Sequence, residues 1–312
     1  MAILKYRDAL NAALREEMQR DPSVFCLGEG IGDKGGSYKV TDKLINQFGP
    51  ERVIDTPLSE AGFVGMAGGA AILGARPVVE MLFVDFTYLT MDQVANQIAK
   101  YEFMTGGQGK VPLVLRTQGG VGNGLAGQHS QSLEAMFCHI PGLKVVMPST
   151  PYDAKGLLKS SIRDDGPVIF IENKKLYLTE GEVPDDEFLI PLGKADIKRS
   201  GNDVTIVTWS YMVLECLKAA DLLAEQGVNA EVIDIRTLVP LDEQCILDSV
   251  NKTGRLLVVH EAPARGGYGG DILSTVIEKA FYALESPARR VAGKNTTVPF
   301  NINLEKLCIP SV

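Results

Sequence analysis

Short apolar runs alternate with longer amphipathic segments along most of the chain, and this alternation restricts the possible folds more than any other feature. Buried strands are predicted at residues 24–27, 52–55, 77–82, 111–116, 144–147 and 168–172. Helical spacing of apolar residues predicts helices at residues 5–20, 41–49, 59–74, 87–104, 130–138 and 151–164. Because strands that alternate with helices form parallel sheets covered on both faces, the sequence predicts a doubly wound α/β fold.

The alternation stops at residues 173–203, where charged residues and two prolines replace the apolar spacing. It then restarts, with predicted strands at 204–209, 230–235 and 256–260 and predicted helices at 211–226, 242–252 and 269–284. A chain of 312 residues has the length of two domains. We therefore expect a first domain at residues 1–190, with a linker from about residue 173, and a second domain at residues 191–312.

Composition excludes several classes of protein. The net charge is −8, which argues against a chain that grips nucleic acid through a basic field. The five cysteines are scattered through apolar runs without zinc spacing, which is typical of reduced thiols in the cytoplasm. No run of 18 apolar residues and no signal or transit peptide pattern is present. A cytoplasmic α/β protein remains, with no reaction implied.

Two glycine-rich segments match the dinucleotide pattern G-x-G-x-x-G. The first, at residues 30–35, follows a strand, and Asp55 ends the next strand at the spacing of an NAD site. Glu29 would place a carboxylate beside the pyrophosphate, and four further residues separate the glycines from the next helix. The second match, at residues 122–127, has no acidic residue at the end of the following strand. Both segments also fit loops that need glycine for their backbone conformation.

Two titratable residues stand where parallel strands are expected to end. His129 follows the glycine-rich loop 119–127, at the edge of the sheet where open α/β folds bind ligands. Its imidazole suits proton transfer or anion binding, and a helix-capping role is an equal alternative. Glu60 follows Ser59 at a helix start, and on this pattern alone a capping pair that complements the helix dipole is the favoured interpretation.

Longer motifs go beyond these patterns. Residues 35–40 with Glu29, 54–63, 128–134, 141–148, 153–157, 235–242 and 260–263 occur in one order and spacing over nearly the whole chain. Together they resemble the beta subunit of thiamine-dependent 2-oxoacid and acetoin dehydrogenases. The resemblance implies a transketolase-like pyrimidine-binding domain followed by a transketolase C-terminal domain. The family pattern usually continues past Ile309 and Pro310 into a short helix, whereas this sequence ends at Val312.

The resemblance also implies a cofactor and partners. Thiamine diphosphate would lie between this chain and an alpha subunit, usually two of each, and the alpha subunit would supply magnesium through a Gly-Asp-Gly motif. No Gly-Asp-Gly occurs here, which is consistent with the beta half alone. We therefore expect activity only with an alpha subunit. The acyl group would pass to lipoamide on an acyltransferase partner.

Individual roles follow from the matched positions. Glu60 would bind N1′ of the cofactor aminopyrimidine, Phe86 would stack on that ring, and Glu29 is expected among the cofactor-binding residues. His129 would help to hold the substrate or the lipoyl group. Some relatives also bind potassium through backbone carbonyls, and the corresponding residues are Leu113, Ser161, Ile162, Asp164 and Gly166.

The substrate stays open between acetoin and pyruvate, with branched-chain 2-oxoacids as the alternative. Residues 84–86, 119–122 and 147–153 look more like the acetoin and bacterial pyruvate branches, and residues 260–263 also occur in branched-chain relatives. Two interpretations of other classes remain. One is an NAD-dependent dehydrogenase built on residues 30–35, and the other is a noncatalytic transketolase-like binding module.

Overall fold

Seven strands form the larger sheet of the computed structural model, which describes all residues from Met1 to Val312. Their order across the sheet is β12-β6-β7-β5-β4-β2-β3, and every neighbouring pair is parallel except β12 and β6. The strands are β2 (Val24–Gly28), β3 (Val53–Asp55), β4 (Arg76–Met81), β5 (Val114–Gly119), β6 (Lys144–Val146), β7 (Val168–Asn173) and β12 (Thr237–Val239). The predicted doubly wound sheet is therefore confirmed, with one antiparallel edge strand added.

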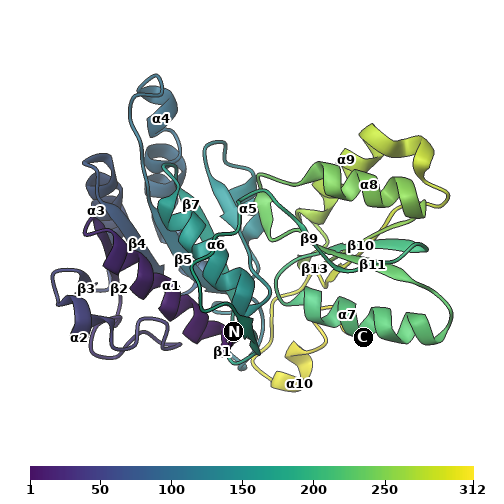
Figure 1. Cartoon of the computed structure of the whole chain (residues 1–312), viewed down its shortest axis with the longest axis horizontal. Helices are drawn as coiled ribbons and strands as arrows, with labels where there is room; N and C mark the ends of the chain where they lie inside the picture. The colour runs from purple at the N-terminus through teal and green to yellow at the C-terminus, as the bar shows by residue number, and fades with distance from the viewer.

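Helices cover both faces of this sheet (Figure 1). One buried cluster packs the strands against α1 and α6, and the other packs them against α3, η2 and α5. Alternate residues along a strand point to opposite faces of the sheet. Val114 packs in the cluster with α1 and α6, and Leu115 packs in the cluster with α3, η2 and α5. The helices are α1 (Tyr6–Arg20), α2 (Leu44–Phe48), α3 (Glu60–Ile72), η1 (Val84–Thr90), η2 (Asp92–Ile98), α4 (Tyr101–Met104), α5 (Glu134–Cys138) and α6 (Pro151–Arg163).

The prediction of a single helix at residues 87–104 is wrong. That segment is divided into the 3-10 helix η1, the π-helix η2 and the short helix α4, which projects from the top of the molecule in Figure 1. In η1 the hydroxyl groups of Thr87 and Thr90 donate to the carbonyls three residues earlier, at 2.6 and 2.9 Å. Such side-chain bonds compete with regular helical hydrogen bonds, and the apolar spacing does not reveal them.

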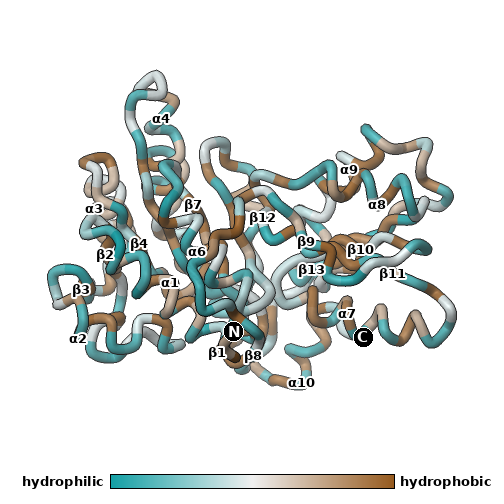
Figure 2. The backbone as a smooth tube through the Cα atoms, viewed as in Figure 1, coloured by the Kyte–Doolittle hydropathy of each residue, from teal (hydrophilic) through white to brown (hydrophobic).

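A second sheet of five strands follows, in the order β14-β13-β10-β11-β9, with only β9 antiparallel. Figure 1 shows α7 on one side of it and α8 and α9 on the other, and Figure 2 shows apolar residues concentrated along β10 in its centre. Its elements are β9 (Asp196–Arg199), β10 (Val204–Thr208), α7 (Met212–Glu225), β11 (Ala230–Asp234), α8 (Glu243–Thr253), β13 (Leu256–Pro263), α9 (Gly269–Ala280), η3 (Phe281–Ala283), β14 (Arg289–Gly293) and α10 (Ile302–Glu305).

The segment 173–203 is more regular than the sequence indicates. It contains β8 (Glu180–Val183), which pairs with β1 (Ala2–Lys5) in a small antiparallel sheet, and also β9 of the second sheet. Each of these strands has only four residues, too few for a clear alternation in the sequence. Strands β12 and β14 and helix α10 are further elements that the sequence analysis does not predict.

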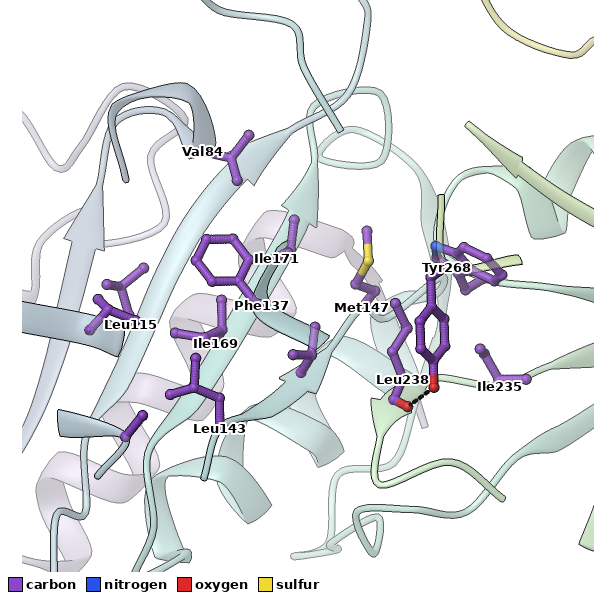
Figure 3. Close-up of a cluster of buried hydrophobic side chains, with 14 of the residues drawn as sticks. Val84, Leu115, Phe137, Leu143, Met147, Ile169, Ile171, Ile235, Leu238 and Tyr268 are labelled. Carbon is purple, nitrogen blue, oxygen red and sulfur yellow. Dashed lines mark hydrogen bonds between the residues drawn. The ribbon is translucent and has the colours of Figure 1, made fainter. Parts of the chain in front are cut away.

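One hydrophobic cluster of 33 buried residues runs from the larger sheet into the second one. Figure 3 shows its middle part, where Met147, Leu238 and Tyr268 lie between the two sheets. The Tyr268 hydroxyl donates to the Leu238 carbonyl at 2.6 Å, which satisfies the one polar group of that ring. The halves of the chain therefore share a core. None of the helices combines the length and the apolar composition that a membrane crossing requires.

Candidate active site

The ends of four adjacent parallel strands, β5-β4-β2-β3, carry most of the residues predicted for the site. The strands end at nearly the same level, because Gly28 of β2 pairs with both Asp55 of β3 and Glu80 of β4. Each strand is followed by a loop or a helix start. In an open α/β sheet this edge is the usual position of a ligand crevice.

Glu60 is the first residue of α3, which follows β3 after a four-residue connection. The sequence favoured a cap in which the Ser59 hydroxyl bonds to the helix amides, but that hydroxyl makes no capping hydrogen bond. Instead, the backbone carbonyl of Ser59 accepts a hydrogen bond from the Phe63 amide at 3.0 Å. Capping therefore does not account for this pair, although a carboxylate in the first turn still complements the helix dipole.

Glu29 directly follows β2 and lies close to Glu60. It is half-buried, and its Oε1 atom is buried without a hydrogen-bond partner. Burial, followed by the negative charge of Glu60, raises the pKa of Glu29 above its usual value. A buried carboxylate oxygen without a partner is unusual in a folded protein, and it fits a site that binds a polar group.

Phe86 lies in η1, which follows β4, and His129 lies in the loop after β5. Their ring centres are 5.2 Å apart and the rings are nearly perpendicular, at 75°. Phe83 contacts the imidazole of His129 from a second direction, also at 5.2 Å and 76°. The imidazole therefore lies against two aromatic rings, which restrict its orientation. Sequence reasoning did not identify Phe83, although it belongs to the same motif as Phe86.

The glycine-rich loop 119–127 precedes His129 and is held by two carboxylates from the second half of the chain. The Val121 amide donates to Oε1 of Glu261 at 2.5 Å. The amides of Gly122 and Gly124 donate to the two oxygens of Glu305 at 2.9 and 3.2 Å. A phosphate would need these same amide groups as hydrogen-bond donors, but they already donate to the two carboxylates. The second glycine motif is therefore a structural loop.

The first glycine motif does not form a dinucleotide site either. Asp55, which would bind a ribose in an NAD site, accepts a hydrogen bond from the Gly32 amide at 2.8 Å. The next helix, α2, begins only at Leu44, after Lys43 in a left-handed conformation. No helix N-terminus therefore faces the glycines, and a Rossmann site requires one.

The five residues predicted for potassium lie at the opposite edge of the larger sheet. Leu113 precedes β5, and the others form the last turn of α6 and the residues after it. Nη1 of Arg76 donates to the carbonyls of Ile162 and Asp164, at 3.0 and 2.9 Å. The Leu113 carbonyl accepts from the Val168 amide at 2.9 Å. The Ser161 carbonyl accepts from the Asp164 amide at 3.3 Å, so four of the five predicted oxygens already accept one hydrogen bond, and each retains a second lone pair.

Family models match nearly the whole chain. Residues 3–179 match the transketolase pyrimidine-binding domain, and residues 193–312 match the transketolase C-terminal domain. A solved structure of a split-gene transketolase, described as an inactive β4 tetramer, has the same fold, with a TM-score of 0.80 and 21% identity over 98% of this chain and 93% of that one. Fold and site thus define a transketolase-type protein.

Curated relatives narrow this class. The acetoin:2,6-dichlorophenolindophenol oxidoreductase subunit beta of Cupriavidus necator is 49% identical over 99% of this chain and 94% of its own length. The pyruvate dehydrogenase E1 component subunit beta-2 of Oryza sativa subsp. japonica is 46% identical over 98% of this chain and 82% of its own length. The 2-oxoisovalerate dehydrogenase subunit beta of Bacillus subtilis is 44% identical over 98% and 94%. The chain belongs to this family of oxidoreductase beta subunits, as the resemblance implies.

Proposed function

We propose that this chain is the beta half of a thiamine-diphosphate-dependent dehydrogenase. With an alpha subunit it would cleave acetoin or pyruvate and pass the acyl group to the lipoamide of an acyltransferase. The observation that carries the proposal is the row of Glu60, Glu29, Phe86 and His129 along one edge of the sheet, with an unpartnered carboxylate oxygen in it. The relatives named above act on this range of substrates.

These residues fit the cofactor chemically. Thiamine diphosphate supplies an electron sink for breaking the bond beside a carbonyl group. Glu60 would share a proton with N1′ of the aminopyrimidine, a task that needs a carboxylate. Phe86 would stack on the pyrimidine ring. His129 would donate a hydrogen bond to an oxygen of the substrate, and the rings around it would keep water away.

Glu29 influences Glu60 through their shared negative charge. Two neighbouring carboxyl groups do not both ionise readily, which agrees with the raised pKa of Glu29. A carboxyl group with a raised pKa keeps its proton to higher pH, and this lowers the negative charge beside Glu60. We therefore propose that Glu29 binds the cofactor edge next to Glu60 and limits the charge of the site.

An alpha subunit is expected to cover the exposed apolar surface along α3, the helix that begins at Glu60. Leu58 and Leu73, on either side of α3, are 83% and 89% exposed, and Met66 on the helix is half-exposed. Apart from Glu60, α3 contains only apolar and small residues. A helix of this composition is normally buried on all sides, so an exposed face favours a partner. The inactive tetramer of the structural neighbour supports the idea that a lone beta chain lacks activity.

The finer details are proposals that rest on the family resemblance. We expect two alpha and two beta chains, with magnesium held by the alpha subunit. Potassium would bind the backbone carbonyl oxygens of Leu113, Ser161, Ile162, Asp164 and Gly166, of which all but that of Leu113 lie at the C-terminal end of α6 or directly after it. That end carries the negative pole of the helix dipole, which favours a cation. The domain boundary near residue 190 is likewise a proposal.

The test is reconstitution with the neighbouring alpha-type chain and thiamine diphosphate. Dye reduction is measured with acetoin, pyruvate and branched-chain 2-oxoacids. We expect turnover of acetoin or pyruvate, and about a 100-fold or greater loss of kcat in Glu60→Gln, because an amide cannot exchange the proton. The exposed Glu51→Gln serves as the control and keeps full activity.

Three results would contradict the proposal. Full activity in Glu60→Gln would remove the role of that carboxylate. No turnover of any of the substrates would remove the dehydrogenase assignment, and tight NADH binding by the isolated chain would favour a dinucleotide enzyme instead. Preference for branched 2-oxoacids would keep the mechanism and change only the substrate.

A further inference from the structure

Lys174 is a buried lysine at the centre of the candidate site that the proposed chemistry does not use. It directly follows β7, and its own amide donates to the Gly119 carbonyl at 3.2 Å, where the glycine-rich loop begins. Its side chain is only 5% exposed. Lysine is rarely buried to this extent unless a carboxylate pairs with it. Lys174 forms no salt bridge, so its position needs another explanation.

The ammonium group contacts the segment that carries the catalytic imidazole. Nζ of Lys174 donates a hydrogen bond to the backbone carbonyl of His129 and lies 3.5 Å from the hydroxyl of Ser130. It also lies 5.4 Å from the centre of the Phe83 ring, within the range of a cation–π interaction. Phe83 in turn contacts the imidazole of His129. One charge therefore holds both the backbone of His129 and a ring that orients its side chain.

A second contact fixes the same segment two residues later. Oδ1 of Asp85 accepts hydrogen bonds from the Gln131 amide and from its side chain, at 3.2 and 2.8 Å. Asp85 lies between Phe83 and Phe86 in η1, so the segment 129–131 is tied to the aromatic residues at both ends. Between residues 119 and 133 no helix or strand supports the loop, so these side chains provide the support.

We propose that Lys174 is the positioning residue of His129, and that its unpaired ammonium group holds the imidazole in place for the reaction. The proposal rests on the proposed function, because it assumes that His129 contacts the substrate. A charge-assisted hydrogen bond is stronger than a neutral one, so the positive charge matters as well as the length of the side chain. Substitution of Lys174 should therefore lower kcat more than it changes KM.

The charge of Lys174 should depend on pH in the range used for assays. Burial lowers its pKa to about 8, whereas the charges of Asp85, Glu261 and Glu305 act in the opposite direction. These acids face the ammonium group from η1, β13 and α10, and His129, whose backbone carbonyl the ammonium group contacts, carries a further titratable side chain. Above pH 8 the amine becomes neutral, and its hold on the His129 carbonyl weakens.

The experiment compares Lys174→Met with the wild type in the reconstituted alpha–beta enzyme. Methionine keeps an apolar chain of similar length and removes the charge. We expect kcat to fall about 10- to 100-fold at pH 7, the effect of one lost charge-assisted hydrogen bond. The deficit should be at least about threefold smaller at pH 9.5, where the wild-type amine is also neutral. KM and the affinity for thiamine diphosphate should change less than about twofold.

Two further variants complete the design. Lys175→Met is the matched control, because the Lys175 ammonium lies over the Tyr211 ring, 4.2 Å from its centre, whereas the Lys174 ammonium contacts His129. It should keep the wild-type kcat and pH profile. Lys174→Arg keeps a positive charge at every pH, so its deficit at pH 7 should be smaller than that of Lys174→Met, and its activity should not decline above pH 8.

The inference is overturned if Lys174→Met keeps kcat within about twofold of the wild type, or if its deficit is the same at pH 7 and pH 9.5. The second result would indicate a residue that only supports folding. Glu60→Gln is measured in the same series. If that variant loses activity while Lys174→Met does not, the inference fails alone; if Glu60→Gln is fully active, the proposed function fails first.

Discussion

Glu134 and Trp209 form a buried contact that can report on protonation near the site. Nε1 of Trp209, the only tryptophan in the chain, donates to Oε1 of Glu134 at 3.3 Å. Burial raises the pKa of Glu134 to about 7, and the charge of Glu261 acts in the same direction. The carboxyl group is therefore neutral at low pH and charged above neutrality, next to a fluorescent ring.

We predict that the tryptophan emission of the isolated chain titrates with a midpoint near pH 7. Glu134→Gln should abolish this transition, because the amide keeps the shape and has no charge to gain. The pKa of Glu134 is higher in the folded chain than in the unfolded chain, where it is near 4.5. The contribution of the protonated carboxyl group to stability is therefore fully present below pH 4.5 and is lost as the pH rises through 7. Chemical denaturation should show that, between pH 4 and pH 8, the wild type loses about 3 kcal/mol more of its free energy of unfolding than the variant does. An unchanged titration in Glu134→Gln would contradict the assignment.

At the scale of elements, three adjacent strands of the larger sheet are joined by one buried arginine. Arg116 of β5 forms two hydrogen bonds to Glu172 of β7, at 2.7 and 2.9 Å, and one to Glu80 of β4 at 2.8 Å. The Tyr177 hydroxyl donates to the same Glu172 at 2.6 Å. The charged side chains of Arg116, Glu80 and Glu172 are at most 3% exposed. Each charge has lost its hydration and depends on the opposite charges beside it to offset that loss.

Arg116→Met should leave two buried carboxylates without their counter-charge. Breaking such a group costs about 3–5 kcal/mol, which corresponds to a decrease in thermal midpoint of roughly 6–20 °C for a chain of this size. Differential scanning calorimetry of the isolated chain measures it. The exposed Arg289→Met is the control and should shift the midpoint by less than about 2 °C. An equally small shift in Arg116→Met would show that the cluster does not stabilise these strands.

At the scale of the whole molecule, the two sheets share one core, and the second half of the chain adds a strand to the larger sheet. The 33-residue cluster includes Leu115 of the larger sheet and Val207 of the second, and β12 crosses over from the second half of the chain to pair with β6. The carboxylates of Glu261 and Glu305 add polar contacts from the second half to the glycine-rich loop. The halves are therefore expected to stabilise each other.

We predict that the isolated chain unfolds in a single cooperative transition. Tryptophan emission, which reports on Trp209 after β10, and far-ultraviolet circular dichroism, which reports on all helices, should give coincident thermal curves. Two separate transitions would mean that the shared core contributes little. A fragment of residues 1–190 lacks β12 and one side of the cluster, so it should aggregate under conditions in which the full chain stays folded.

Much of the candidate site could be predicted because its residues belong to local motifs. Glu60, Glu29, Phe86 and His129 each follow a strand that the apolar spacing predicts, and the structure places all four along one edge of the sheet. Their chemical roles come from the family resemblance and are proposals. For Glu60 the local pattern alone favoured a cap, because a single sequence does not show whether the Ser59 hydroxyl is bonded.

The sequence by itself determined the alternation of strands and helices, the type of sheet and the family, because periodicity and motifs are local properties of the chain. Only the tertiary structure decided the place of β12, the clamp on the glycine-rich loop and the burial of Lys174. These contacts join residues far apart in the chain, with 140 positions between Val121 and Glu261 and 183 between Gly122 and Glu305. No local pattern encodes them, because each depends on how distant segments of the chain come together in the folded molecule.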